Sequence, residues 1–235
     1  MMIKCGMQVI FCGDFFQLPP VANKIYEDDG SYCFENEIFN DLFPHKVVLD
    51  VNIRQSESVL IQRLVKCTDG NISQNTERFI KSLSRPLSMS DEDSVKLFAR
   101  NDLVDDYNRQ CLLDFPGQLY EFHSLDTGKT TALNPPLHAD IAEREQFPLK
   151  PAFGLTIHKA QGMTLSRVEI DCSGIFKAGQ LGVAMSRSTT TECLRVINFN
   201  KKFVIPPPHK VIEFMDYQSK KIISPDFLCC REYKG

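Results

Sequence analysis

The chain alternates short apolar runs with amphipathic segments of helical period, and this alternation limits the fold more than any other feature. Apolar runs of four or five residues that end at glycine or polar residues are typical of buried parallel strands. We expect strands at 8–12, 46–51, 95–99, 118–123, 152–156, 167–171 and 194–198, and helices at 34–42, 56–70, 76–83, 102–113, 180–186 and 211–218. This order predicts an α/β fold with a mainly parallel sheet.

Composition limits the answer less sharply. A chain of 235 residues with 43% hydrophobic content can form one large or two small globular domains. Its formal net charge of -3 gives no overall attraction to nucleic acid, so any DNA contact must come from a local groove. The nine cysteines contain no Cys-x-x-Cys pair, which indicates reduced thiols in an intracellular compartment. Neither a secretory signal nor a membrane span is expected.

The first polar cluster follows the apolar run at 8–12. The segment Cys12–Val21 reads CGDFFQLPPV and places Asp14 and Gln17 directly after the predicted strand. Ligands of open α/β sheets sit at the carboxyl ends of strands. The neutral amide of Gln17 has both a donor and an acceptor, and can orient a water or touch a phosphate. An isolated Gly-Asp before two prolines is more often a plain polar turn, but the whole segment favours a functional loop.

A second polar cluster lies in Leu155–Leu165, which reads LTIHKAQGMTL. It sets five hydrogen-bonding side chains into a short segment after an apolar strand: Thr156, His158, Lys159, Gln161 and Thr164. Such a segment suits the phosphate backbone of a nucleic acid strand, a contact that is independent of base sequence and sensitive to salt. The pair His158-Lys159 alone would be a solvated helix start.

These two segments resemble motifs III and V of the petite-integration-frequency (Pif) family of superfamily 1B DNA helicases, relatives of RecD. Val51–Gln55 is similar to the family's motif IV, and Gly179–Arg187 to its motif VI. The family usually has a tyrosine at the place of Gly182 and a leucine at that of Met185. The resemblance covers residues 10–217 in pieces.

The resemblance implies the fold of the P-loop NTPase (RecA-like) helicase lobes. Residues 1–50 would be the end of a first lobe, and residues 51–235 a second lobe. That lobe is shortened around 133–150, where the family carries an inserted small β-barrel. An intact relative uses ATP and Mg²⁺ to unwind DNA 5′ to 3′ in repair, recombination and telomere maintenance. The implied partners are single-stranded DNA or DNA forks, for a monomer in the nucleus or mitochondrion.

The resemblance also assigns roles to residues. Catalytic roles would fall to Gln17, Arg54 and Arg187. Nucleotide contacts would come from Asp14, Gln17, Arg54, Gln180 and Arg187, and DNA contacts from the five polar residues of motif V. An arginine suits a phosphate because its planar fork of donors is always charged. No residue is expected to bind a metal directly.

One absence changes the expected activity. The 235 residues contain no Gly-x-x-x-x-Gly-Lys-Ser/Thr loop, and the acidic pair that holds magnesium in the family is missing. Asp126–Thr131 includes a Gly-Lys-Thr, but His123 stands where the first glycine is required, so a hairpin or loop is expected there. We therefore expect this chain alone to bind no ATP and to be inactive. Three alternatives stay open: a divergent helicase, a non-catalytic single-strand-binding or interaction module, and a piece of a longer helicase.

Overall fold

The computed structural model describes residues 9–43, 46–49, 51–87, 94–118, 120–128 and 142–220. A four-stranded sheet with the order β4-β1-β5-β6 forms its centre, and every neighbouring pair is parallel. The strands are β1 (Val95–Phe98), β4 (Gly154–Thr156), β5 (Val168–Asp171) and β6 (Leu194–Ile197). The strands predicted at 95–99, 152–156, 167–171 and 194–198 are confirmed to within two residues, and with them the α/β fold.

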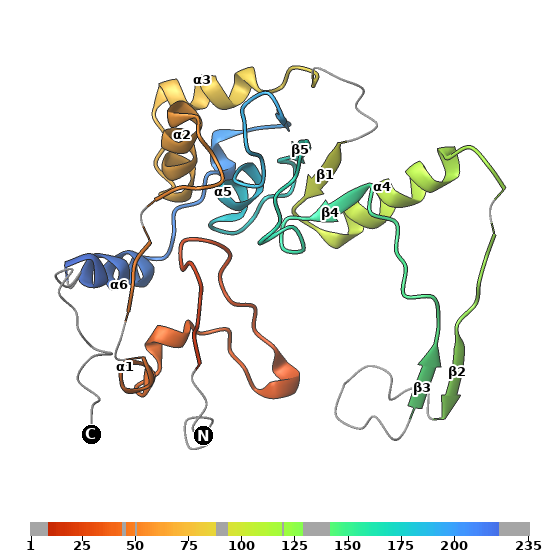
Figure 1. Ribbon diagram of the computed structural model, residues 1–235, viewed down its shortest axis with the longest axis horizontal. Coiled ribbons are helices and arrows are strands. Elements are labelled where there is room, and N and C mark those ends of the chain that lie inside the picture. Colours follow the sequence, from red (N-terminus) through yellow and green to blue (C-terminus); the bar gives the residue numbers. More distant parts are fainter. Residues whose placement is uncertain are drawn as a thin grey trace, which may run out of the picture.

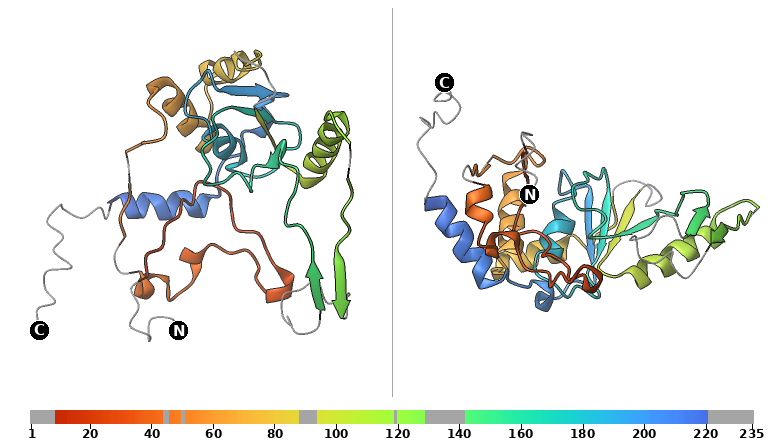
Figure 2. Two further views of the ribbon diagram at one scale, coloured as in Figure 1. Left: turned by 45° about the vertical axis from the view of Figure 1, so that its right-hand side comes forward. Right: turned by 90° about the horizontal axis from the view of Figure 1, so that it is seen from below.

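The helices are α1 (Phe39–Leu42), α2 (Ser58–Thr68), α3 (Gln74–Ser82), α4 (Asn101–Asp114), α5 (Gln180–Met185) and α6 (His209–Lys220), with 3-10 turns η2 (Lys24–Tyr26), η3 (Cys33–Glu35) and η6 (Lys201–Phe203). Four of the helices, α2 to α5, lie around this sheet, and α1 and α6 lie apart from it (Figures 1 and 2). Helix α2 packs on α5, α3 on β6, and α4 on β4 and β1. In the described part of the chain, no helix has the length and apolarity to cross a membrane.

Two groups of polar side-chain contacts fix the positions of the strands. Glu169 on β5 is paired with Lys96 on β1 (2.7 Å) and with Arg195 on β6 (2.6 Å), in line with the register of these strands. The side chain of Asn108 on α4 binds the backbone of Gly154 on the edge strand β4. It accepts from the N–H of Gly154 (2.7 Å) and donates to the carbonyl of the same residue (3.0 Å). Because Asn108 belongs to α4, this pair of bonds holds that helix against the edge of the sheet.

Three predictions for the first 50 residues are wrong. Residues 9–12 and 46–49 form no strand, because no other strand among the described residues lies beside them to complete a ladder. The apolar side chains of both runs are exposed as a result, with Ile10 at 79% and Leu49 at 89%. The helix expected over 34–42 is broken into η3 and α1. The domain boundary expected near residue 50 stays a prediction.

The segment between α4 and β4 also differs from the prediction. The strand expected over 118–123 does not form in its described residues, and residues 142–145, where no strand is expected, form one. Strands β2 (Leu125–Gly128) and β3 (Ala142–Glu145) pair antiparallel in a ribbon away from the parallel sheet (Figure 1). The bidentate pair of Arg144 and Asp126 (2.6 and 2.8 Å) crosses this ribbon. Asp126 and Gly128 thus lie on a strand, as the hairpin interpretation expects, and residues 129–131 lie outside the described residues.

Candidate functional site

A tight turn presents Gln17. The carboxylate of Asp14 accepts hydrogen bonds from the backbone N–H of Phe16 (2.9 Å) and from Nε2 of Gln17 (3.0 Å). The backbone N–H of Gln17 donates to the carbonyl of Asp14 (3.2 Å). A short acidic side chain that bonds the backbone two residues on is a local way to fix a turn. The oxygens of Asp14 are therefore engaged within the turn, while Oε1 of Gln17 faces the rest of the site.

Arg54 reaches the site from the extended segment before α2. Its Nε donates to Oγ1 of Thr164 (3.0 Å), and its Nη1 donates to the carbonyl of Ser186 (3.1 Å). The neighbouring Gln55 is buried and donates to the carbonyls of Ser186 (3.0 Å) and Ser188 (2.7 Å). Gln55 thus anchors the segment to the end of α5, and this places the guanidinium of Arg54.

Arg187 follows α5 and is only 2% exposed. Its guanidinium donates to the carbonyls of Val183 (2.9 Å) and Met163 (3.2 Å), and to the hydroxyl of Ser186 (2.6 Å). Burial, and then the charge of Arg54, lower the pKa of Arg187 to about 10. All of these acceptors are neutral, so they satisfy the donors of Arg187 without balancing its charge.

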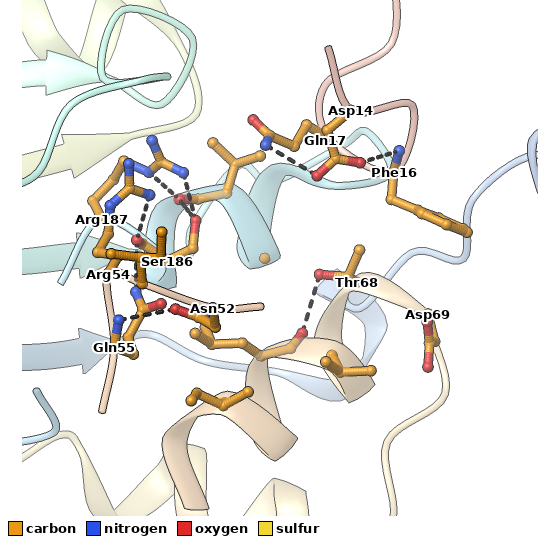
Figure 3. Close-up of a pocket in the computed structure, with 16 residues that line it drawn as sticks. Asp14, Phe16, Gln17, Asn52, Arg54, Gln55, Thr68, Asp69, Ser186 and Arg187 are labelled. Carbon is orange, nitrogen blue, oxygen red and sulfur yellow. Dashed lines mark hydrogen bonds between the residues drawn. The ribbon is translucent and has the colours of Figure 1, made fainter. Parts of the chain in front are cut away.

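The two arginines lie beside each other next to Ser186, on one wall of a cavity of about 460 Å³ (Figure 3). The turn from Asp14 to Gln17 forms another wall, and the apolar end of α2 lines the floor. Within the described residues, neither Arg54 nor Arg187 has a carboxylate within ion-pair distance. Two adjacent cations that are not ion-paired favour an anion at this wall, while the carboxylates of Asp14 and Asp69 line other parts of the cavity.

Gln161 and Thr164 do not line this first cavity themselves, but each binds a residue that does. Oγ1 of Thr164 accepts from Arg54, and Nε2 of Gln161 donates to Oε1 of Gln17 (3.1 Å). Both were predicted to contact DNA, and that role stays a prediction. Their present partners are two of the predicted nucleotide-binding residues, so the segment 155–165 is in direct contact with the turn at Gln17.

The other three predicted DNA residues line a second cavity, of about 580 Å³. Thr156 is buried and its Oγ1 accepts from the backbone N–H of Lys159 (3.3 Å), while the side chain of Lys159 is exposed. Burial, and then the charge of Lys177, lower the pKa of His158. The lining residues are Val21, Ala99, Arg100, Asn101, Asp102, Thr156, His158, Lys159, Phe176 and Lys177.

Sequence reasoning missed Lys177 and Arg100 in this cavity. Arg100 pairs with the exposed carboxylate of Asp102, whereas Lys159 and Lys177 form no ion pair with any of the described residues. Lys177 lies 18 residues from Lys159 in sequence, on the turn before α5. The sequence held no signal for this proximity, because it arises from the packing of that turn beside β4.

Gln180 does not reach either cavity. It is fully buried, and its Oε1 accepts from the backbone N–H groups of Phe176 (2.9 Å) and Lys177 (3.0 Å). Its side chain therefore shapes the turn that carries Lys177. The predicted contact of Gln180 with a nucleotide stays a prediction.

The implied cofactors fit these residues unequally. The acid-free guanidinium pair fits the oxygens of a phosphate group, with Gln17 on the facing wall. Magnesium needs several oxygen ligands. The described residues contain no group of three or more His, Cys, Asp or Glu side chains that would hold a metal ion.

Comparison with known proteins relates the chain to one kind of enzyme, although no family model matches it. It is 25% identical to ATP-dependent DNA helicase PIF1 of Xenopus laevis over 290 residues, covering 92% of this chain and 45% of the relative. The human helicase of the same name is 24% identical over 279 residues, covering 89% of this chain and 43% of the relative. The chain thus spans less than half the length of these relatives.

Solved structures agree with this relationship. The crystal structure of Pif1 helicase from Candida albicans matches with a TM-score of 0.78 at 26% identity, over 88% of this chain and 68% of that one. Pif1 helicase from Bacteroides, in complex with ADP-AlF3 and ssDNA, matches with a TM-score of 0.74 at 22% identity, over 89% and 66%. Over most of its length, the chain is homologous to Pif1-family ATP-dependent DNA helicases and shares their α/β fold.

Proposed function

We propose that this chain forms the second-lobe side of an ATP-dependent DNA helicase, which couples ATP hydrolysis to 5′ to 3′ movement along single-stranded DNA. One observation carries the proposal. Arg54 and Arg187 are far apart in sequence, but Arg54 donates to the carbonyl of Ser186 and Arg187 donates to its hydroxyl. Neither guanidinium is ion-paired within the described residues, and both face the cavity opposite Gln17. Such an arrangement suits a transferring phosphoryl group, on which negative charge is spread over several oxygens.

The roles of the residues follow from their contacts. Arg54 and Arg187 bind the terminal phosphate, and arginines in this role contribute on the order of 10³–10⁵ in rate where a phosphate loop and metal hold the nucleotide. Gln17 lies between the arginine cavity and Gln161 of motif V. If nucleotide binding moved Gln17, its hydrogen bond to Gln161 would transmit the movement to the segment that carries His158 and Lys159.

The second cavity is the proposed path of single-stranded DNA. Lys159 and Lys177 supply positive charge to its lining, and the neutral imidazole of His158 supplies a hydrogen-bonding edge. Contacts of this type bind phosphates without reading bases. The Bacteroides relative, crystallised with ADP-AlF3 and ssDNA, supports assigning the two ligands to one protein of this fold.

The polypeptide of these 235 residues should not hydrolyse ATP by itself. The 235 residues lack the glycine-rich loop whose backbone N–H groups and lysine hold the β- and γ-phosphates. The match to the Xenopus helicase runs over 290 residues, more than the 235 of this chain. That relative therefore carries additional residues within the matched span, which supports a shortened second lobe.

The test is phosphate release with and without an oligonucleotide, combined with thermal unfolding in tripolyphosphate. We expect phosphate release equal to a buffer blank, and a rise in the unfolding temperature with tripolyphosphate that disappears in Arg54→Met and Arg187→Met. Arg109→Met, which removes an exposed arginine of α4, is the control and should keep the rise. Robust DNA-stimulated hydrolysis would contradict the inactivity of this polypeptide.

A non-catalytic single-strand-binding module is the alternative function, and the second cavity favours it because its lysines need no nucleotide. The same experiment separates the two. Oligonucleotide binding together with a tripolyphosphate effect that depends on the arginines supports the helicase assignment. Oligonucleotide binding without any effect of tripolyphosphate supports the module.

A further inference from the structure

An aromatic cluster lies outside the main core and joins the segment 9–43 to α6. Phe214 of α6 stacks on Phe34 (ring centroids 4.3 Å apart, 10° between planes) and meets Phe15 edge-on at 5.4 Å. Phe15 also meets Phe34 edge-on at 4.9 Å, and Tyr32 stacks on Phe34 at 5.1 Å. Offset and edge-on pairs at these distances contribute about 0.5–1.5 kcal/mol each beyond the burial of their area.

Charged contacts fix α6 in the same place. Nζ of Lys210 pairs with the carboxylate of Glu35 (2.8 Å) and lies 5.1 Å from the ring centroid of Tyr32. Figures 1 and 2 show α6 beside the segment that carries α1 and the Gln17 turn. The cluster therefore connects two parts of the chain that are nearly 200 residues apart in sequence.

The same turn is held from a second side by backbone contact. A Cβ placed on Gly179, just before α5, would lie 2.4 Å from the carbonyl oxygen of Gln17 and 2.9 Å from that of Phe16. Only glycine permits this approach, and Gly179 also has a positive φ of 76°. The turn thus has two kinds of contact with the rest of the chain. The carbonyls of Phe16 and Gln17 lie against Gly179, and the ring of Phe15 packs in the aromatic cluster.

We infer that Phe214 is a positioning residue for Gln17. Its ring holds Phe15, which occupies the second position of the Asp14–Gln17 turn, and the turn directs Oε1 of Gln17 toward Nε2 of Gln161. Without the ring of Phe214, the turn keeps its internal bonds to Asp14, and Phe15 keeps its contact with Phe34 but loses its contact with α6. The significance for catalysis rests on the proposed function, because Gln17 is the residue placed between the two cavities.

The test observes the Gln17–Gln161 hydrogen bond directly, in the chain as it is. Protein labelled with ¹⁵N-glutamine gives side-chain amide signals by NMR, and the Gln161 signal is identified by its loss in Gln161→Leu. Gln17→Leu gives the position of that signal without its acceptor. We expect Phe214→Ala to move the Gln161 signal toward this acceptor-free position, while Phe214→Tyr, which keeps the ring, leaves it in place.

Two controls separate positioning from general damage. The side chain of Gln55, which donates to Ser186 and Ser188 in the main core, should keep its signal in every variant. Ile212→Ala removes apolar volume from α6 at a position outside the ring cluster and should leave the Gln161 signal unchanged. If Phe214→Ala does not fold, Phe214→Leu replaces it, because leucine keeps most of the apolar contact but not the ring.

The inference is overturned if the Gln161 signal stays at its parent position in Phe214→Ala and Phe214→Leu, or if Ile212→Ala moves it equally. Oligonucleotide binding measured on the same samples tests the proposed function separately. A parent chain that binds no oligonucleotide would contradict that function and leave the positioning role of Phe214 standing.

Discussion

His158 illustrates how a residue's surroundings fix its protonation state. Its side chain is half-buried beside Lys177, and Nε2 is buried without a hydrogen-bond partner. Burial, and then the charge of Lys177, hold the pKa of His158 below the usual value of 6.5. The imidazole is therefore neutral at physiological pH, and the cavity's positive charge comes from lysine and arginine.

This protonation state predicts a pH dependence of stability. Because the folded pKa of His158 is lowered, the unfolded chain binds the proton more readily, and stability falls as pH decreases below about 6.5 toward the folded pKa. His158→Gln should remove this part of the loss, measured as the urea midpoint between pH 7.5 and 5. His123→Gln, at an exposed position, is the control and should retain the parent's pH dependence. An identical pH dependence in His158→Gln would contradict the buried, neutral imidazole.

Among the helices, α2 and α5 are in close contact where Thr68 lies against Gly182. A Cβ on Gly182 would lie 2.7 Å from Oγ1 of Thr68 and 3.5 Å from the backbone of that residue, so a larger side chain would first meet this hydroxyl. Oγ1 of Thr68 is itself held by a hydrogen bond to the carbonyl of Leu64 (3.0 Å). Gly182 is thus matched to Thr68, and both line the arginine cavity.

Gly182→Ala should therefore destabilise the chain by about 1–2 kcal/mol through overpacking, even though alanine is the better helix former. Thr68→Ala removes the hydroxyl that the new methyl group would meet. The double change should recover most of the loss, giving a clear coupling energy in a double-mutant cycle of urea unfolding. Additive effects of the two changes would show that the cost of Gly182→Ala does not come from the hydroxyl of Thr68.

Elements with a strong local signal were predictable, and those that depend on distant partners were not. Buried strands such as Val168–Asp171 are recognisable in the sequence as apolar runs. The helix expected at 76–83 is confirmed as α3, which begins earlier, at Gln74, after Ser73, whose Oγ accepts from the backbone N–H of Thr76 (3.2 Å). Residues 46–49 have the apolarity of a strand but no neighbour to pair with in the described chain. Strand β2 was missed because Leu125–Gly128 has little apolar character and is held by pairing with β3.

The site shows the same division. Motif resemblance named both arginines and Gln17, and the structure brings all three to one cavity. It did not separate Gln161 and Thr164 from His158 and Lys159, because the division depends on contacts across more than 100 residues of sequence. Lys177 was missed for the same reason.

The whole molecule combines two cavities that differ in chemistry. One has a pair of arginines without carboxylate partners, the other carries exposed lysine, and the Gln17–Gln161 hydrogen bond lies between them. The net charge of -3 means that binding of DNA depends on the local lysines. Affinity at physiological salt should consequently be low, and it should respond to single lysine changes.

Binding of single-stranded DNA as a function of salt tests the central claim most directly. Fluorescence anisotropy with a labelled oligonucleotide should give log affinity falling with log salt at a slope of about -1.4, since each neutralised phosphate of a single strand contributes about -0.7 and two lysines line the cavity. Lys159→Ala should halve this slope, and the exposed Lys66→Ala of α2 should not change it. Affinity that is independent of salt, or unchanged in the double variant His158→Ala, Lys159→Ala, would contradict the assignment of the second cavity to DNA.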